Sequence, residues 1–231
     1  MQKPYVQKIS TVSKFDVYYV DGKYIRTNIN EEFTNFGQHY RFRFIPESEF
    51  WIDLEHTPGE AEFFIDHMLI ENRLMALGMK YDDALAKADK VEMKERRKVD
   101  LIQKGIKPGH KKDEYLPKIR KKLLQKYDNG LAVWLVDGEL IRDVFFIDFT
   151  EGGHDKVYHF VPPGEVWLDD DLQPGELKYV LLHEVHERRL MAQGWEYHRA
   201  HRSASHIEYH CRHHPQELEL KLQEEIEKNK V

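Results

Sequence analysis

The chain contains one long sequence unit twice, and this duplication constrains its fold more than any other feature. The segments "YYVDGKYIR" (18–26) and "WLVDGELIR" (134–142) match, as do "YDDALAKADKVE" (81–92) and "YHRAHRSASHIE" (197–208). All matching pairs share one offset, and roughly a third of the aligned positions are identical. We therefore expect the two halves to share one architecture. Two long units are too few and too large for a solenoid.

The first part of each unit is predicted to be a small antiparallel sheet. The Asp-Gly pairs at 21–22 and 137–138 are strong signals for hairpin turns. Alternating aromatic residues predict a strand at 39–45 and another at 156–161. A further short strand is expected around the tryptophans, Trp51 and Trp167.

The second part of each unit is predicted to be a pair of helices. A Pro-Gly pair marks the start of the first helix, a glycine is typical of its C-terminal cap, and a tyrosine stands near the start of the second helix. These boundaries are Pro58-Gly59, Gly78 and Tyr81 in one unit and Pro174-Gly175, Gly194 and Tyr197 in the other. The pattern predicts an α+β fold, built as a tandem duplication of a sheet followed by two helices.

The two units are predicted to span residues 10–98 and 127–214. Between them lies a basic connector, 99–126, in which we expect a short helix around 116–126. The remaining residues, 215–231, read as a charged C-terminal helix that packs weakly or projects from the second unit.

Bulk properties narrow the functional classes. The chain has 231 residues, a formal charge of −6 and a single cysteine, which suits a reducing compartment. No apolar run approaches the roughly 20 residues of a membrane helix, and the first residues lack the apolar core of a signal peptide. We therefore expect a cytoplasmic protein with no membrane partner. Its substrate or protein partner is not indicated. The basic stretch at 94–126 leaves nucleic-acid binding open, although a solvated face is the simpler interpretation.

Ionisable residues stand within the apolar face of the helix pair in the second unit. His183 and Glu187 lie one turn apart, and the next helix adds His201 and Glu208. A buried carboxylate without a partner costs several kcal/mol, so these groups must satisfy one another, bind a cation or face a wet pocket. Zinc takes imidazole and carboxylate ligands. We predict zinc bound by His183, Glu187 and Glu208, with His201 as a fourth ligand or an orienting group.

The first unit keeps only part of this set. It has His67, Glu71 and Glu92, but Met68 replaces Glu184 and Leu85 replaces His201. A methionine cannot accept a proton, so we predict a non-catalytic copy with a residual metal site or a hydrogen-bonded triad. The alternative is that a buried His-Glu-Glu network locks the helices of both units without metal. The chain would then be a non-enzymatic binding or assembly module.

The segment His183-Glu184-Val185-His186-Glu187 resembles the zincin helix H-E-x-x-H, with glutamate at the second histidine position. A glutamate from a downstream helix is similar to the third ligand of gluzincin metallopeptidases, and here it corresponds to Glu208. By this resemblance Glu184 is the general base and the chain is a zinc-dependent, peptidase-like hydrolase. The resemblance covers only this helix pair. Because Glu187 stands where the zincin motif has its second histidine, His201 or His186 would have to supply that imidazole ligand.

Two further features carry weaker predictions. Gly152-Gly153-His154 is interpreted as a turn, with the edge of the pocket as the alternative. A cluster near the end of the second unit is a candidate for a second metal site, although its spacing matches no zinc finger. Its members are His206, His210, Cys211, His213 and His214.

Overall fold

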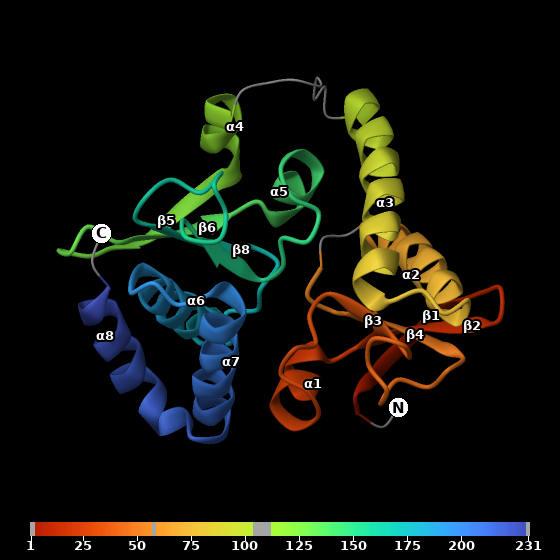
Figure 1. The fold of residues 1–231 in the computed structure, drawn as a ribbon, viewed down its shortest axis with the longest axis horizontal. Coiled ribbons are helices and arrows are strands. Elements are labelled where there is room, and N and C mark those ends of the chain that lie inside the picture. Colours follow the sequence, from red (N-terminus) through yellow and green to blue (C-terminus); the bar gives the residue numbers. More distant parts are fainter. Residues whose placement is uncertain (1–2, 57–58, 104–111, 230–231) are drawn as a thin grey trace. The chain divides into compact units, whose positions relative to one another are not determined.

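The structure, a computed structural model, describes residues 3–56, 59–103 and 112–229 (Figure 1). The chain forms two compact units, Met1–Gly109 and His110–Val231. Each unit is a four-stranded sheet accompanied by helices, so the predicted α+β class and the repeated architecture are confirmed.

The elements of the two units follow the same order. The first unit contains β1 (Tyr5–Val12), β2 (Phe15–Val20), α1 (Gly22–Asn28), β3 (Phe36–Gln38), β4 (Glu49–Asp53), α2 (Ala61–Ala76) and α3 (Tyr81–Gln103). The second contains α4 (Lys112–Ile119), β5 (Arg120–Lys126), β6 (Ala132–Val136), α5 (Gly138–Val144), β7 (Gly152–His154), β8 (Glu165–Asp169), α6 (Leu177–Ala192), α7 (Tyr197–His213), the 3₁₀ turn η1 (Pro215–Glu217) and α8 (Leu218–Lys228). The helix boundaries at the two glycines and the two tyrosines lie where the sequence predicts them.

Each sheet is mixed rather than wholly antiparallel. The strand orders are β1-β2-β4-β3 and β5-β6-β8-β7. The central pairs, β2 with β4 and β6 with β8, are parallel, while the outer pairs are antiparallel. A parallel pair needs a crossover connection, and here α1 or α5 with the segment after it provides that connection.

The Asp-Gly pairs do not form hairpin turns, so this prediction is wrong. Asp21 and Asp137 are instead the N-caps of α1 and α5, where their carboxylates accept the backbone N–H of the third following residue. The glycine is required because a Cβ on Gly22 would lie 1.7 Å from a carboxylate oxygen of Asp53. The real hairpin of the first unit turns at Ser13, whose φ is 57°.

The alternating aromatic segments are not strands either. Residues 39–45 form successive turns, in which the backbone N–H groups of Phe42 and Ile45 donate to the carbonyls of Gln38 and Phe42. The rings of Phe42 and Phe44 pack with Trp51 in a core cluster. Residues 156–161 form equivalent turns. Burial, rather than alternation along a strand, therefore explains the aromatic pattern.

The connector and the C-terminal helix also differ from the prediction. Residues 120–126 are β5, the first strand of the second unit, and only 112–119 are helical. The connector residues 104–111 lie outside the described residues. The last helix does not project, because Leu218, Leu222 and Ile226 are buried in the core of the second unit.

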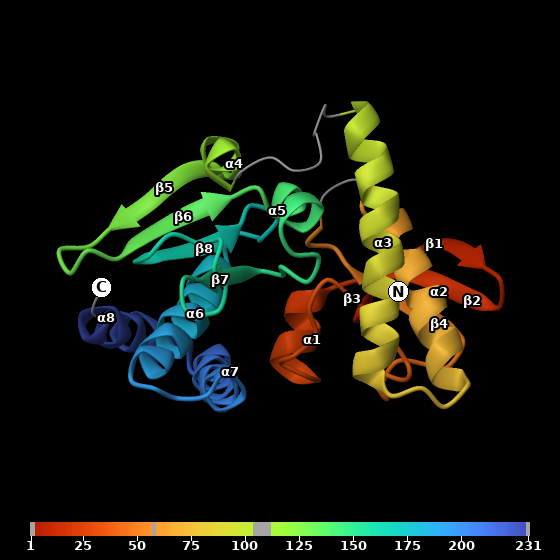
Figure 2. The same ribbon diagram turned by 45° about the horizontal axis from the view of Figure 1, so that its top comes forward.

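Helix packing sets the position of the candidate site. In the second unit α6 packs against β7 and β8, and α7 and α8 both pack against α6 (Figure 2). In the first unit α2 packs against β3 and β4, with α3 beside it. Within the described ranges, every helix is too short or too polar to cross a membrane.

Candidate metal centre

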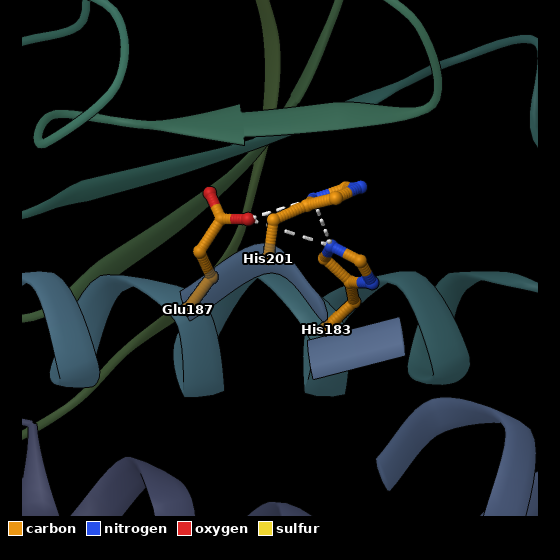
Figure 3. Close-up of side chains that lie close together, drawn as sticks. All are labelled: His183, Glu187 and His201. Atoms are coloured by element: carbon orange, nitrogen blue, oxygen red, sulfur yellow. Dashed lines mark hydrogen bonds and ion pairs between the residues drawn. The ribbon is translucent and has the colours of Figure 1, made fainter. Parts of the chain in front are cut away.

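Two helices bring together three of the predicted ligands. His183 and Glu187 stand on successive turns of α6, and the ring of His201 from α7 meets both (Figure 3). His201 Nδ1 lies 2.8 Å from Glu187 Oε2 and 3.1 Å from His183 Nε2. His183 Nε2 lies 3.7 Å from the same carboxylate oxygen. One donor atom from each residue therefore faces a common point.

Glu208 takes a different position from the one predicted. His183 Nδ1–H donates to Glu208 Oε2 at 2.9 Å, on the side of the ring away from His201. The other oxygen of Glu208 accepts from Arg212 Nε at 2.9 Å, and Arg212 also pairs with Glu176. Glu208 thus orients His183 and turns its Nε2 toward Glu187 and His201. Metal-binding histidines commonly have such a carboxylate behind them.

His154, at the end of β7, holds the second oxygen of Glu187. The backbone N–H of Lys156 donates to His154 Nδ1 at 3.1 Å, which places the ring proton on Nε2. His154 Nε2–H then donates to Glu187 Oε1 at 3.1 Å. Burial lowers the pKa of His154, which keeps the ring neutral. His154 is therefore a donor that positions Glu187 and not a ligand itself.

The electrostatics concentrate negative charge on the ligand carboxylate. Burial alone would raise the pKa of Glu187, but hydrogen bonds from His154 and His201 and the nearby ring of His183 hold this pKa well below its usual range. Burial opposes protonation of His183, yet the neighbouring Glu187 and Glu208 raise its pKa well above the usual value. A proton on His183 Nε2 supplies the positive charge that these acids require, and a metal ion bound at this nitrogen would replace that proton.

Glu184 lies beside this cluster with opposite properties. A carboxylate oxygen of Glu184 lies within 4.8 Å of a donor atom of His154 and of Glu187. Burial raises the pKa of Glu184 to about 8. A carboxyl group that titrates near neutral pH is suited to accept and return protons. The surroundings therefore raise the pKa of Glu184 and lower that of Glu187. Opposite shifts in two neighbouring carboxyl groups are typical of acid–base sites.

The first unit repeats the supporting frame without the extra groups. His67 Nδ1–H donates to Glu92 at 2.8 Å, and Arg96 pairs with Glu92 and with Glu60. Gln38 donates to Glu71 Oε1 at 2.5 Å, in the manner of His154. Four pairs of residues at matching positions distinguish the two sites: Gln38 and His154, Met68 and Glu184, Leu85 and His201, Phe36 and Gly152.

Access to solvent also distinguishes the two sites. In the first unit the ring of Phe36 packs on His67 at 5.0 Å between centroids, and the His67 side chain is 1% exposed. Gly152 replaces this ring in the second unit, where even a Cβ would lie 3.2 Å from Glu184 Cγ. The side chains of His183 and His201 are 12% and 34% exposed. The second site is open to solvent, whereas the first is closed.

The remaining candidates lie elsewhere. His186 faces Ser203 at 2.9 Å and Glu225 at 3.2 Å, so it does not replace the missing ligand. Cys211 is a core residue whose thiol pKa is raised by burial. His210 bonds to Glu217, His213 and His214 bond to backbone carbonyls of α7, and His206 is exposed. Among the described residues, no group suited to hold a metal includes this cluster.

Three described cations of the basic stretch are paired within their own units. Arg96 is buried against two glutamates, Arg120 pairs with Glu165, and Lys121 pairs with Asp170. These residues stabilise the fold of their own units. Their pairing weakens the case for a phosphate-binding surface at these positions.

Comparisons of the chain with protein-family profiles, with curated proteins and with solved structures find no match. The chemistry proposed below therefore rests on the residues of the site and on their geometry.

We predict that the donor role of His154 can be replaced by an amide. Gln38 makes the same two hydrogen bonds in the first unit, accepting from a backbone N–H and donating to Glu71. His154→Gln should therefore keep zinc affinity within about threefold, whereas His154→Leu should lower it by roughly 10–100-fold. Competition with a chromogenic chelator measures both. Equal affinity for the leucine variant would show that His154 does not position Glu187.

We also predict a pH-dependent contribution of His67 to the stability of the first unit. Burial opposes its charged form, but the carboxylates of Glu71 and Glu92 beside the ring raise its pKa from 6.5 to about 9. A raised pKa stabilises the fold below pH 6.5, and this contribution is lost as the pH rises through about 9. The protection of α2 amides from hydrogen exchange should fall over this range and should fall less in His67→Gln. An equal slope in both proteins would contradict the ion pair.

Proposed function

We propose that the second unit binds zinc through His183 Nε2, Glu187 Oε2 and His201 Nδ1 and acts as a metal-dependent hydrolase. The observation that carries this proposal is the convergence of the three donor atoms, all within 4.8 Å of one another, at a place that reaches solvent. Two imidazoles and one carboxylate are ligands that suit zinc better than magnesium or calcium. Three protein ligands leave the fourth position for water or substrate.

The residues around the ligands support hydrolysis. Zinc lowers the pKa of a water that it binds to about 7. Glu184 lies next to Glu187, where its carboxyl group would serve as the general base for a water held by zinc and would return the proton to the leaving group. His154 and Glu208 fix the orientations of Glu187 and His183, so the ligand geometry is formed before a cation arrives.

A non-catalytic role is the second candidate, and the first unit favours it for the shared residues. His67, Glu71 and Glu92 form a closed network with no solvent access, and this network joins α2 to α3. The same residues in the second unit would then only lock α6 to α7. This alternative leaves unexplained why Glu184, His201 and Gly152 occur together in the second unit alone.

Zinc titration and activity assays separate the two candidates. One zinc ion should bind each chain with micromolar or tighter affinity, and hydrolysis of a panel of chromogenic peptides, esters and phosphoesters should stop on chelation and return with added zinc. A chain that takes up no zinc at micromolar concentrations would leave only the structural candidate.

A further inference from the structure

A groove on the first unit has the position that α8 covers on the second. The groove runs between the β1–β2 turn and one face of α2. Its lining includes Lys14, Phe15, Leu69, Arg73 and Leu77. Leu77 is exposed and so is its match in the second unit, Gln193, so the comparison with α8 concerns the part of the groove around Phe15, Leu69 and Arg73. In the second unit the β5–β6 turn and the equivalent face of α6 are both covered by α8.

The contacts of α8 show how such a surface holds a helix. Leu218, Leu222 and Ile226, at positions i, i+4 and i+8, bury one apolar face. Glu225, at i+7, accepts from Arg189 Nε at 2.5 Å. Asn129 in the β5–β6 turn donates to the carbonyl of Ile226 at 2.7 Å. An apolar stripe and an acid–arginine pair therefore hold the helix, together with hydrogen bonds at its C-terminal end.

The groove of the first unit keeps the apolar residue and the arginine of this surface, while Ser13, Ile70 and Asn72 stand at the positions of Asn129, His186 and Arg188. Arg73 stands at the position of Arg189, and Leu69 stands at the position of Val185. In the described part of the first unit Arg73 makes no ion pair, and its side chain is exposed. The groove thus presents an apolar floor and a cation at the place where α8 supplies an acid.

The described residues of the first unit continue α3 where the second unit turns back. In the second unit α7 ends at His213, and Pro215 turns the chain back toward α6. In the first unit α3 continues to Gln103, past the equivalent position. The described residues of the first unit therefore place no counterpart of α8 over α2.

We propose that this groove binds an amphipathic helix of a partner protein, with apolar residues at i, i+4 and i+8 and an acid at i+7 that pairs with Arg73. The proposal is independent of the metal site. A partner is favoured over α8 of a second copy, because Leu218, Leu222 and Ile226 are only 7–8% exposed within their own unit. Exchanging α8 between copies would expose these side chains in one unit in order to cover the groove of another.

A labelled peptide of residues 214–231 provides a probe with this chemistry. We expect saturable binding to the full chain by fluorescence anisotropy, weakened at least about tenfold by Leu69→Asp or by Arg73→Glu. A peptide carrying Glu225→Lys should bind poorly to the unchanged chain and regain affinity for Arg73→Glu. Thermal unfolding checks that both variants remain folded.

Three results would overturn the proposal. The first is no saturable binding up to millimolar peptide. The second is a peptide affinity that Arg73→Glu leaves unchanged and Arg189→Glu lowers, which would show that the peptide exchanges with α8 in the second unit. The third is a dimer of the chain, seen by sedimentation, that Arg73→Glu dissociates, because a second copy would then be the occupant.

Discussion

Replacing His201 by leucine, the residue at the matching position of the first unit, is expected to lower the zinc affinity of the chain by about 100-fold or more. Loss of an orienting group alone costs 10–100-fold, and His201 supplies a ligand atom at the point where His183 and Glu187 meet. Because His201 is 34% exposed and Leu85 occupies this position in the first unit, the fold should persist. Chelator competition gives the affinity, and circular dichroism checks the fold.

His206→Leu is the matched control for this substitution. His206 is an exposed histidine on the same helix, α7, and is not part of the candidate site. Its zinc affinity should equal that of the unchanged chain. If His201→Leu and His206→Leu bind zinc equally well, the ion is not held by the site described above.

Replacing Glu184 is expected to reduce hydrolysis without removing the metal. General acid–base groups contribute roughly 10²- to 10⁴-fold to the rate, so Glu184→Gln and Glu184→Met should lower the turnover of any substrate found in the panel by about this factor. Zinc affinity should change little, because Glu184 is not one of the three ligands. The pairing of these two measurements distinguishes a proton-transfer role from a ligand role.

The reciprocal substitution Met68→Glu supplies a control in the first unit. This substitution adds the same carboxylate to the first unit, where Phe36 packs on His67 and closes the site. It should give no activity. Turnover that survives in both Glu184 variants would mean that another group accepts the proton.

The sequence predicts the helical half of each unit well and the sheet poorly. The helix pairs are bounded by local signals, such as Gly78 and Gly194, both of which have φ of 89°. The short strands depend on contacts distant in sequence. The Asp-Gly pair is a case in point, because its glycine is required by the carboxylate of Asp53, which no local pattern reveals.

The candidate site shows the same division. Helical spacing places His183 and Glu187 on one face, and the length of the turn between α6 and α7 brings His201 to them. Which nitrogen of His183 faces Glu208 depends on Arg212 and Glu176, so the sequence does not separate an orienting group from a ligand. His154 and Gly152 come from the sheet, where the register was not predicted.

Comparison of the two units at matching positions is the signal that does reveal these residues. At three positions an apolar or amide residue of the first unit becomes ionisable in the second, and at a fourth an aromatic ring becomes glycine. The structure places all four changes around one cluster. Positions that differ between the duplicated units are therefore the ones that mark the candidate site.

Anomalous X-ray diffraction from zinc-loaded crystals at the zinc edge tests the central claim most directly. The account predicts one peak per chain, about 2 Å from His183 Nε2, Glu187 Oε2 and His201 Nδ1, with Glu208 and His154 in contact with the ligands and not with the ion. A zinc-loaded crystal with no peak at this point, or with its peak at the exposed histidines of α7, would contradict it.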